Sequence, residues 1–206
     1  MGWFRNLKIS IKLLVGFLAV AVIAGIIGVV GVINIMNIDK ASTQLYEDNT
    51  LGLRHVGDAS IQFQRIRVNA LKLLLVTDEK ERSEYIDKIN EHVNVVESEL
   101  KRYEEVITNE DDQKRFSTVM NLWANFQSLL EDIIQHIESG ENEEAQKLMF
   151  EKSGSTIDSL NDMFEELFEY NTSEAEEKAN RNTRVSNMAA NTMMLVVMIG
   201  TVIAVL

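Results

Sequence analysis

The sequence predicts an all-α protein, an antiparallel up-down-up-down four-helix bundle flanked by two transmembrane helices, the second of them truncated. Three observations predict it. The 206 residues contain no proline, an apolar run stands near each end, and apolar residues in between recur at alternating steps of three and four. Average usage of roughly 5% would place about ten prolines in such a chain, and proline interrupts helices. An all-β protein is therefore excluded.

Composition also limits the chemistry. The chain has no cysteine, so disulfides, thiolate metal sites and cysteine nucleophiles are excluded. The formal charge of −12 argues against nucleic acid, which is bound through clustered lysine and arginine. His55, His92 and His136 fall on different predicted helices with no second ligand at metal spacing, and we interpret them as solvated or edge histidines. No catalytic constellation is visible, so we expect no catalytic residue, no metal site and no cofactor.

The first predicted element is a transmembrane helix over residues 13–33. These 21 residues carry no charge and span roughly 31 Å as a helix, which matches a bilayer core. Arg5, Lys8 and Lys12 precede the run without an acidic residue, so residues 1–12 are expected to be cytoplasmic. A cleaved signal peptide is the alternative, but the run exceeds a signal-peptide apolar region and no small-x-small site follows it.

A second apolar run lies at the other end, within residues 191–206. From Met193 to Leu206 it is 14 residues long, roughly 21 Å, which is shorter than a bilayer core. We therefore expect the sequence to stop inside a second transmembrane helix.

Residues 34–190 are expected to form an extracytoplasmic domain. They hold all 32 acidic and 17 of the 20 basic residues, a net charge of −15, so they must face water. Polar and glycine-containing breaks divide them into four long helical segments. The breaks are at residues 77–78, 108–109, 139–140 and 153–155.

The second and third segments are predicted to form an antiparallel helical hairpin, because each has one apolar seam and a short polar turn joins them. The fourth segment is expected to start at Ser155, capped together with Asp158, after a separate short helix within residues 141–151. The two seams are Ile86, Ile89, Val93, Val96, Leu100, Tyr103 and Ile107, and Phe116, Val119, Trp123, Phe126, Leu130, Ile133 and Ile137.

The first segment, up to about Val76, has two apolar lines about 150° apart around the helix. One line would pack into the bundle core, and the other suggests the same helix of a second subunit, giving a two-fold dimer. The alternative is a wide core face that buries both lines. The core line is Val56, Ala59, Phe63, Ile66, Ala70 and Leu73, and the dimer line is Ile61, Gln64, Val68, Leu71 and Leu75.

Two stretches resemble a known family. FRNLKISIKLLVGF leads into the first apolar run, and RHVGDASIQFQRIRVNALKLLLV lies in the first helical segment. With two spans around a four-helix domain, these stretches resemble the N-terminal part of bacterial methyl-accepting chemotaxis proteins. In that family a four-helix-bundle sensor precedes a coiled coil, methylation sites and a kinase-binding tip. The resemblance therefore implies that such parts would follow Leu206.

The resemblance also implies a ligand site. Aspartate-type receptors of this kind hold their ligand between the first helices of two subunits with arginines, and the match puts Arg67 and Lys72 on two of the basic positions. The third falls on Val76, which is not basic and puts an amino-acid ligand in doubt. Independently, helical spacing sets Arg65 and Lys72 on one border of the dimer line and Arg67 on the other, where they could hold a carboxylate. The alternative is that these side chains simply lie over the seam with solvated heads.

The expected function is the ligand-sensing input module of a chemoreceptor in the bacterial cytoplasmic membrane, which transmits a helix displacement across the bilayer. Its expected partners are a second copy of the chain, the lipid bilayer, a small-molecule ligand such as a carboxylate or a ligand-loaded partner protein, and a cytoplasmic kinase complex reached beyond Leu206. No nucleic acid is expected. A sensor histidine kinase and a non-signalling membrane-anchored scaffold are the alternatives.

Overall fold

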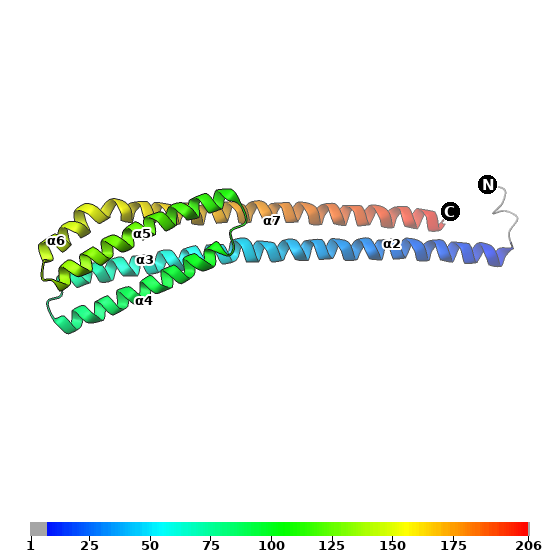
Figure 1. Cartoon of the computed structure of the whole chain (residues 1–206). Coiled ribbons are helices and arrows are strands. Elements are labelled where there is room, and N and C mark those ends of the chain that lie inside the picture. Colours follow the sequence, from blue (N-terminus) through cyan, green and yellow to red (C-terminus); the bar gives the residue numbers. More distant parts are fainter. Residues whose placement is uncertain (1–7, 206) are drawn as a thin grey trace. The chain divides into compact units, whose positions relative to one another are not determined.

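The computed structural model describes residues 8–205, with side chains up to residue 202. Within this range every regular element is helical, which confirms the all-α prediction (Figure 1). Arg5 and Leu206, used above to predict orientation and truncation, lie outside the described residues. The elements are α2 (Ile9–Gln44), the π-helical turn η1 (Leu45–Thr50), α3 (Leu51–Leu75), α4 (Glu79–Glu104), α5 (Glu110–Glu138), α6 (Asn142–Lys147), the π-helical turn η2 (Leu148–Lys152) and α7 (Ser153–Val205).

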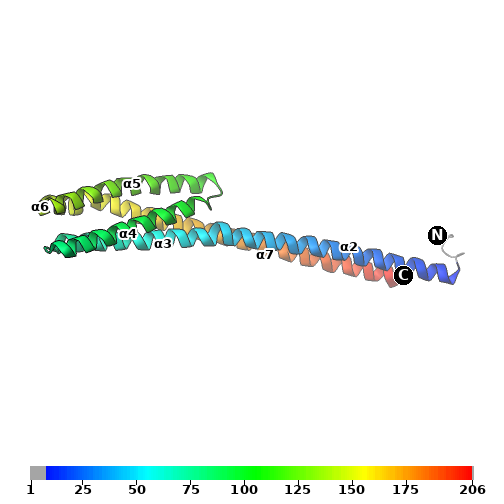
Figure 2. The same cartoon turned by 60° about the horizontal axis from the view of Figure 1, so that its bottom comes forward.

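The chain divides into two compact units. One contains residues 45–176, and the other contains the described residues up to 44 and from 177 onward. The first unit is a four-helix bundle in which α3, α4, α5 and the first part of α7 alternate in direction (Figures 1 and 2). The predicted up-down-up-down bundle and the α4–α5 hairpin are therefore confirmed.

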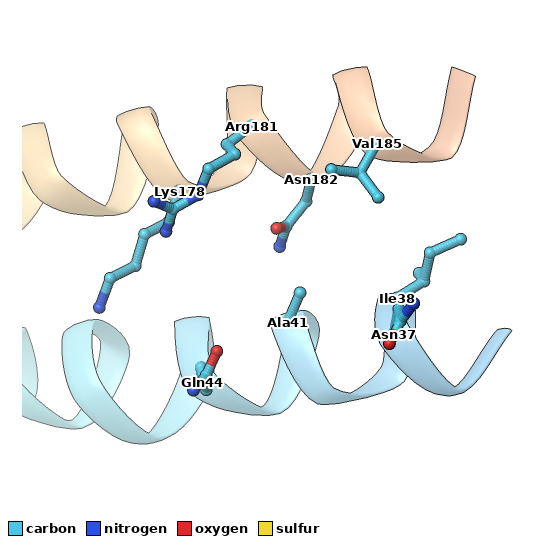
Figure 3. Close-up of a pocket in the computed structure, with 8 residues that line it drawn as sticks. All are labelled: Asn37, Ile38, Ala41, Gln44, Lys178, Arg181, Asn182 and Val185. Atoms are coloured by element: carbon cyan, nitrogen blue, oxygen red, sulfur yellow. The ribbon is translucent and has the colours of Figure 1, made fainter. Parts of the chain in front are cut away.

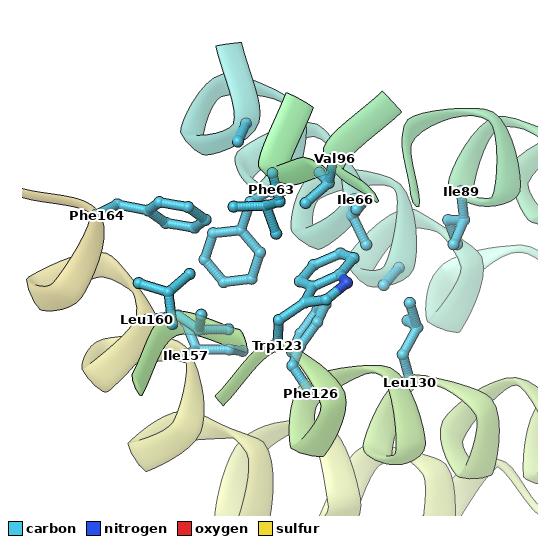
Figure 4. Close-up of a cluster of buried hydrophobic side chains, with 14 of the residues drawn as sticks. Phe63, Ile66, Ile89, Val96, Trp123, Phe126, Leu130, Ile157, Leu160 and Phe164 are labelled. Carbon is cyan, nitrogen blue, oxygen red and sulfur yellow. The ribbon is translucent and has the colours of Figure 1, made fainter. Parts of the chain in front are cut away.

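The core line predicted on α3 faces the inside of this bundle. Phe63 is fully buried, and its ring lies edge-on to those of Trp123 and Phe126 of α5, at centroid distances of 6.4 and 5.0 Å. Phe164 of α7 completes the cluster at 5.9 Å (Figure 4). Such aromatic pairs contribute about 0.5–1.5 kcal/mol each beyond the area they bury. The other predicted core residues of α3 are also buried: Val56, Ala59, Ile66, Ala70 and Leu73.

Three of the predicted breaks are real, each for a local reason. Asp78 caps α4 by accepting a hydrogen bond from the Glu81 backbone N–H at 3.0 Å. Asn109 caps α5 by accepting from the backbone of Asp111 and Asp112. Gly140 follows α5 with a φ of +79°, a conformation that costs glycine little.

The fourth predicted break, at residues 153–155, is wrong. α6, η2 and α7 follow one another without a non-helical residue, so Ser155 lies inside a helix and caps nothing. The hydroxyl of Ser153 instead donates to the carbonyl of Met149 at 2.5 Å, so its buried oxygen has a partner one turn earlier in the same helix. Met149 and Ile157 are both buried on either side, and this packing outweighs the weak helix preference of serine and glycine.

The second unit pairs α2 with the last part of α7, side by side and antiparallel (Figures 1 and 2). Glycines allow close approach there. A Cβ on Gly31 would stand 3.2 Å from Met193 Cε, and one on Gly200 would stand 2.7 Å from Ile23 Cγ2. The helical stretches Ile9–Leu75 and Asn142–Val202 each contain a run long and apolar enough to cross a membrane. The borders at residues 13–33, 34–190 and 191–206 stay predictions, because helices run through them uninterrupted.

Candidate functional site

The outer face of α3 exposes the predicted dimer line. Ile61 is 52% exposed, Val68 49%, Leu71 40% and Leu75 81%. The alternative in which one wide core face buries both apolar lines is therefore wrong. Gln64 stands within this line, but its Nε2 donates to Asn161 Oδ1 of α7 at 2.6 Å. The outer face of α3 is thus an apolar strip with one amide already held by the bundle.

The three predicted ligand residues border this strip, but the structure does not bring them together. Arg67 Nη1 donates to Gln64 Oε1 at 2.6 Å, and its guanidinium lies 5.7 Å from the Phe63 ring. Lys72 Nζ lies 5.9 Å from the ring of Tyr85 on α4. Arg65 is exposed and makes no hydrogen bond or ion pair with the described residues. Within one chain, the three basic side chains therefore lie along the edges of the apolar strip and do not enclose a ligand site.

A buried polar network, missed by the sequence analysis, links four elements at the end of the bundle near residue 45. The Tyr103 hydroxyl of α4 donates to Asp112 Oδ1 of α5 at 2.5 Å and accepts from Asn171 Nδ2 of α7 at 2.6 Å. Asn49 of η1 donates to the Asn171 carbonyl at 3.5 Å, while its own Oδ1 is buried without a partner. Burial, followed by the bond to Asp112, raises the pKa of Tyr103 well above its usual range.

Gly52 allows this network to form. A Cβ at this position would lie 2.7 Å from Asn171 Oδ1 and 3.4 Å from the Tyr103 ring. Only glycine leaves room for the amide, so α3 and α7 can approach closely there. No sequence signal predicted this network, since the partners of the Tyr103 hydroxyl lie on two other helices, α5 and α7.

A second buried contact corrects the interpretation of His55. Its Nδ1 lies 2.6 Å from Glu99 Oε2, both side chains are 9% exposed, and Arg102 donates to the other Glu99 oxygen at 3.0 Å. His55 and Glu99 each precede a core residue by one position, so they sit where α3 and α4 meet. His136, in contrast, is half-buried and contacts Glu141 Oε2 at 2.5 Å. His92 is also half-buried.

A pocket of about 340 Å³ lies between α2 and the last part of α7, entirely within the second unit (Figure 3). Two of its lining residues are basic, three carry amides and none is acidic. This site was not predicted from the sequence, although one signal was present: after Glu177 the chain has three basic residues and no acidic one. The lining residues are Asn37, Ile38, Ala41, Gln44, Lys178, Arg181, Asn182 and Val185.

Metal-ligand chemistry is not evident in the described part of the chain. Among residues 8–205, no group of three or more histidine, aspartate or glutamate side chains is placed to hold a metal ion. What the described residues offer is an apolar strip bordered by basic groups, buried polar contacts between helices and a basic pocket. These features are typical of recognition surfaces and of contacts that couple one helix to another.

Comparison with known proteins agrees with this architecture. A family model described as a four helix bundle sensory module for signal transduction matches residues 6–185. A curated protein of Acetivibrio thermocellus, named as a sensory transducer protein, is 36% identical over 140 residues, which cover 68% of this chain and 25% of that protein. The chain therefore spans a minor part of that relative. The four-helix bundle and the two apolar helices agree with this match. The chain therefore belongs to the family of four-helix-bundle sensory modules for signal transduction.

Proposed function

We propose that this chain is the ligand-sensing input module of a transmembrane chemoreceptor, which passes a helix displacement to a cytoplasmic signalling domain. One observation carries the proposal: α7 runs for 53 residues without interruption from the bundle core into an apolar stretch. Leu160 and Leu167 of this helix are fully buried in the bundle. A shift of α7 by an ångström or two against α3 would therefore be felt at the far end of the same helix.

The family and the two apolar helices point to a membrane receptor without enzymatic activity of its own. In this proposal α2 and α7 cross the bacterial cytoplasmic membrane, and the bundle lies outside. The signalling domain would be carried by a longer parent protein, and a cytoplasmic kinase complex would be its partner. The Acetivibrio relative, which is about four times longer than the matched region, supports a parent protein of that kind.

The proposed sensing unit is a two-fold dimer that joins the outer faces of α3. Four large apolar side chains are exposed along this face, Ile61, Val68, Leu71 and Leu75, and contiguous exposed apolar surface typically marks an interface. Pairing two copies would place Arg65 of each chain at the edge of the shared interface, where a small carboxylate from solution or a ligand-loaded partner protein would be held by charge-assisted hydrogen bonds. The expected coupling between ligand and output is about 1–3 kcal/mol.

The dimer is tested by cysteine cross-linking, for which the cysteine-free sequence is well suited. Val68→Cys and Leu75→Cys in membrane-embedded full chain should form disulfides between subunits, since a disulfide needs Cβ atoms about 4 Å apart. Met120→Cys on α5, which is similarly exposed, is the matched control and should remain monomeric. Equal cross-linking at all three positions would reject the α3 interface.

Sensing is tested by fusing residues 1–206 to the cytoplasmic half of a chemoreceptor in a bacterium that lacks its own receptors. Small carboxylates are then screened for a change in swimming bias. Arg65→Gln should abolish any response, while Arg54→Gln, on the same helix face but 11 residues away, should retain it. A fusion that inserts and dimerises but answers no compound, with no ligand bound by the purified chain, would favour a scaffold.

A further inference from the structure

The buried polar network around Asn171 is the last part of the bundle core through which α7 passes. Asn171 is 3% exposed and is the last buried residue of α7 in the bundle unit. Its Nδ2 donates to the Tyr103 hydroxyl of α4 at 2.6 Å and to the Leu167 carbonyl at 2.9 Å. Its backbone carbonyl accepts from Asn49 Nδ2 of η1 at 3.5 Å. We call the buried side chains of this network the Asn171 layer: Asn49, Tyr103, Asp112 and Asn171.

The Asn171 layer fixes the axial position of α7 more sharply than the rest of the core does. Leu160 and Leu167 pack by apolar burial, which has no preferred direction and so tolerates a slide of the helix more readily. A hydrogen bond, in contrast, weakens steeply once donor and acceptor separate beyond about 3.2 Å. Elsewhere α7 makes exposed hydrogen bonds with neighbouring helices, which water can replace, through Asn161, Glu166 and Tyr170.

The layer is only partly satisfied in the observed position of α7. The bond between Asn49 and the Asn171 carbonyl is 3.5 Å long, at the upper limit for a hydrogen bond, and Asn49 Oδ1 is buried without a partner. Asn49 also belongs to η1, and π-helical turns often occur at functional sites. The contact with Tyr103 is therefore the complete side of the layer, and the contact with η1 is the incomplete side.

Gly52 of α3 makes the layer sensitive to the spacing of α3 and α7. A Cβ at this position would stand 2.7 Å from Asn171 Oδ1. The amide cannot swing aside freely, because its Nδ2 makes two hydrogen bonds. A methyl group at position 52 must therefore break a bond of the layer or move α7. Gly57, five residues later on the same helix, has no neighbouring segment of the described chain within 4 Å of such a Cβ.

We propose that the Asn171 layer is a latch that holds α7 at its resting axial position. With the latch closed, Asn171 is bonded to Tyr103. A displacement of α7 by an ångström or two releases this bond, and the unpaired Oδ1 of Asn49 is then available as an acceptor for the freed amide. The latch therefore sets the proportion of displaced modules at rest, and loss of one buried hydrogen bond changes that proportion about ten-fold. This inference rests on the α7 displacement in the proposed function.

The experiment measures the position of α7 with two spin labels, attached to Lys101→Cys of α4 and Ser173→Cys of α7. Both positions are exposed. The labelled full chain in lipid nanodiscs is measured by pulsed electron paramagnetic resonance, with no compound added. Gly52→Ala should change the mean distance between the labels by about 1–2 Å, the usual size of such helix shifts. Gly57→Ala, the matched control, adds the same methyl group to the same helix and should leave the distance unchanged.

Two further variants separate the latch from a general disturbance of packing. Tyr103→Phe adds no atom and removes only the hydroxyl, so it should change the distance in the same direction as Gly52→Ala does. Asn171→Ala removes the group that a methyl at position 52 would contact, so Gly52→Ala should cause no further change in that background. Circular dichroism shows whether each variant is folded. If Gly52→Ala unfolds the bundle, Tyr103→Phe decides the test.

Each outcome decides the question. A changed distance in Gly52→Ala and Tyr103→Phe, with none in Gly57→Ala, supports the latch. An unchanged distance in the first two variants, or an equal change in Gly57→Ala, overturns it. The same variants in the fused receptor, with no compound added, give a separate measurement of swimming bias. A changed distance with an unchanged bias supports the latch and contradicts the proposed function instead, so the two failures are distinguished.

Discussion

Tyr103 joins three helices through one hydroxyl group, because it donates to Asp112 of α5 and accepts from Asn171 of α7. All three side chains are buried. A buried polar group that loses its partner keeps the cost of leaving water, about 1–3 kcal/mol. The contribution of this residue therefore exceeds that of an isolated surface hydrogen bond.

We expect Tyr103→Phe to lower the free energy of unfolding by about 1–3 kcal/mol, because Asp112 and Asn171 each lose a partner. Tyr46→Phe removes the same atom from a side chain that is 57% exposed and should change stability by less than about 0.5 kcal/mol. Guanidinium unfolding of full chain in detergent, followed by circular dichroism, measures both. Equal effects would show that the network contributes nothing specific.

The raised pKa of Tyr103 predicts a dependence of stability on alkaline pH. The unfolded chain releases this proton near pH 10, while the folded bundle keeps it. The resulting stabilisation is complete below pH 10 and is lost as the pH rises above that value. Between pH 9 and pH 11 the unmodified chain should thus lose more unfolding free energy than Tyr103→Phe. If the unfolding free energies of the two proteins changed with pH in the same way, Tyr103 would not be the group responsible.

The contact between His55 and Glu99 should stabilise the α3–α4 pair more than the half-exposed contact between His136 and Glu141. Double-mutant cycles with alanine measure both couplings by guanidinium unfolding. We expect about 1–3 kcal/mol for the buried pair and about 0–1 kcal/mol for the other, because solvent screens exposed pairs. A coupling at His136 as large as that at His55 would show that burial is not the cause.

At the scale of elements, the caps distinguish true helix starts from apparent ones. Asp78→Ala should cost about 1 kcal/mol because the Glu81 N–H loses its acceptor. Ser155→Ala should be neutral or slightly stabilising, because position 155 is an exposed helix interior where alanine is preferred. Unfolding of the two variants at neutral pH is the measurement. A loss of 1 kcal/mol in Ser155→Ala would mean that a helix start does exist at residue 155.

At the scale of the whole molecule, the uninterrupted α7 is the link between binding and output. Two glycines inserted after Asn187 in the parent receptor should leave ligand affinity unchanged and abolish the response, since glycines weaken a helix by about 1 kcal/mol each. The same insertion at the Ser139–Gly140 turn is the control and should preserve both. Normal signalling with the insertion at residue 187 would exclude transmission through α7.

Much of this architecture follows from the sequence alone. The absence of proline, the two apolar runs and the single seams of α4 and α5 determine the helices and the faces that they bury, because a 3.6-residue period assigns each side chain to one side of a helix. The capping residues Asp78 and Asn109 likewise act locally, within their own first turn. Such capping contacts can be predicted from the sequence because the two partners lie within a few residues of each other.

Tertiary structure decided what depends on neighbours from other helices. The sequence pattern at residues 153–155 favoured a break, but the packing of Met149 and Ile157 keeps the helix continuous. His55 was predicted to be a solvated or edge histidine, and only the packing of α4 showed that it contacts Glu99. The partners of the Tyr103 hydroxyl likewise lie on other helices, α5 and α7. The exposure of the second apolar line on α3 also required the bundle to be assembled. A periodic pattern predicts which residues share one face of a helix. Which residues of other helices pack against that face is determined only when the helices are assembled.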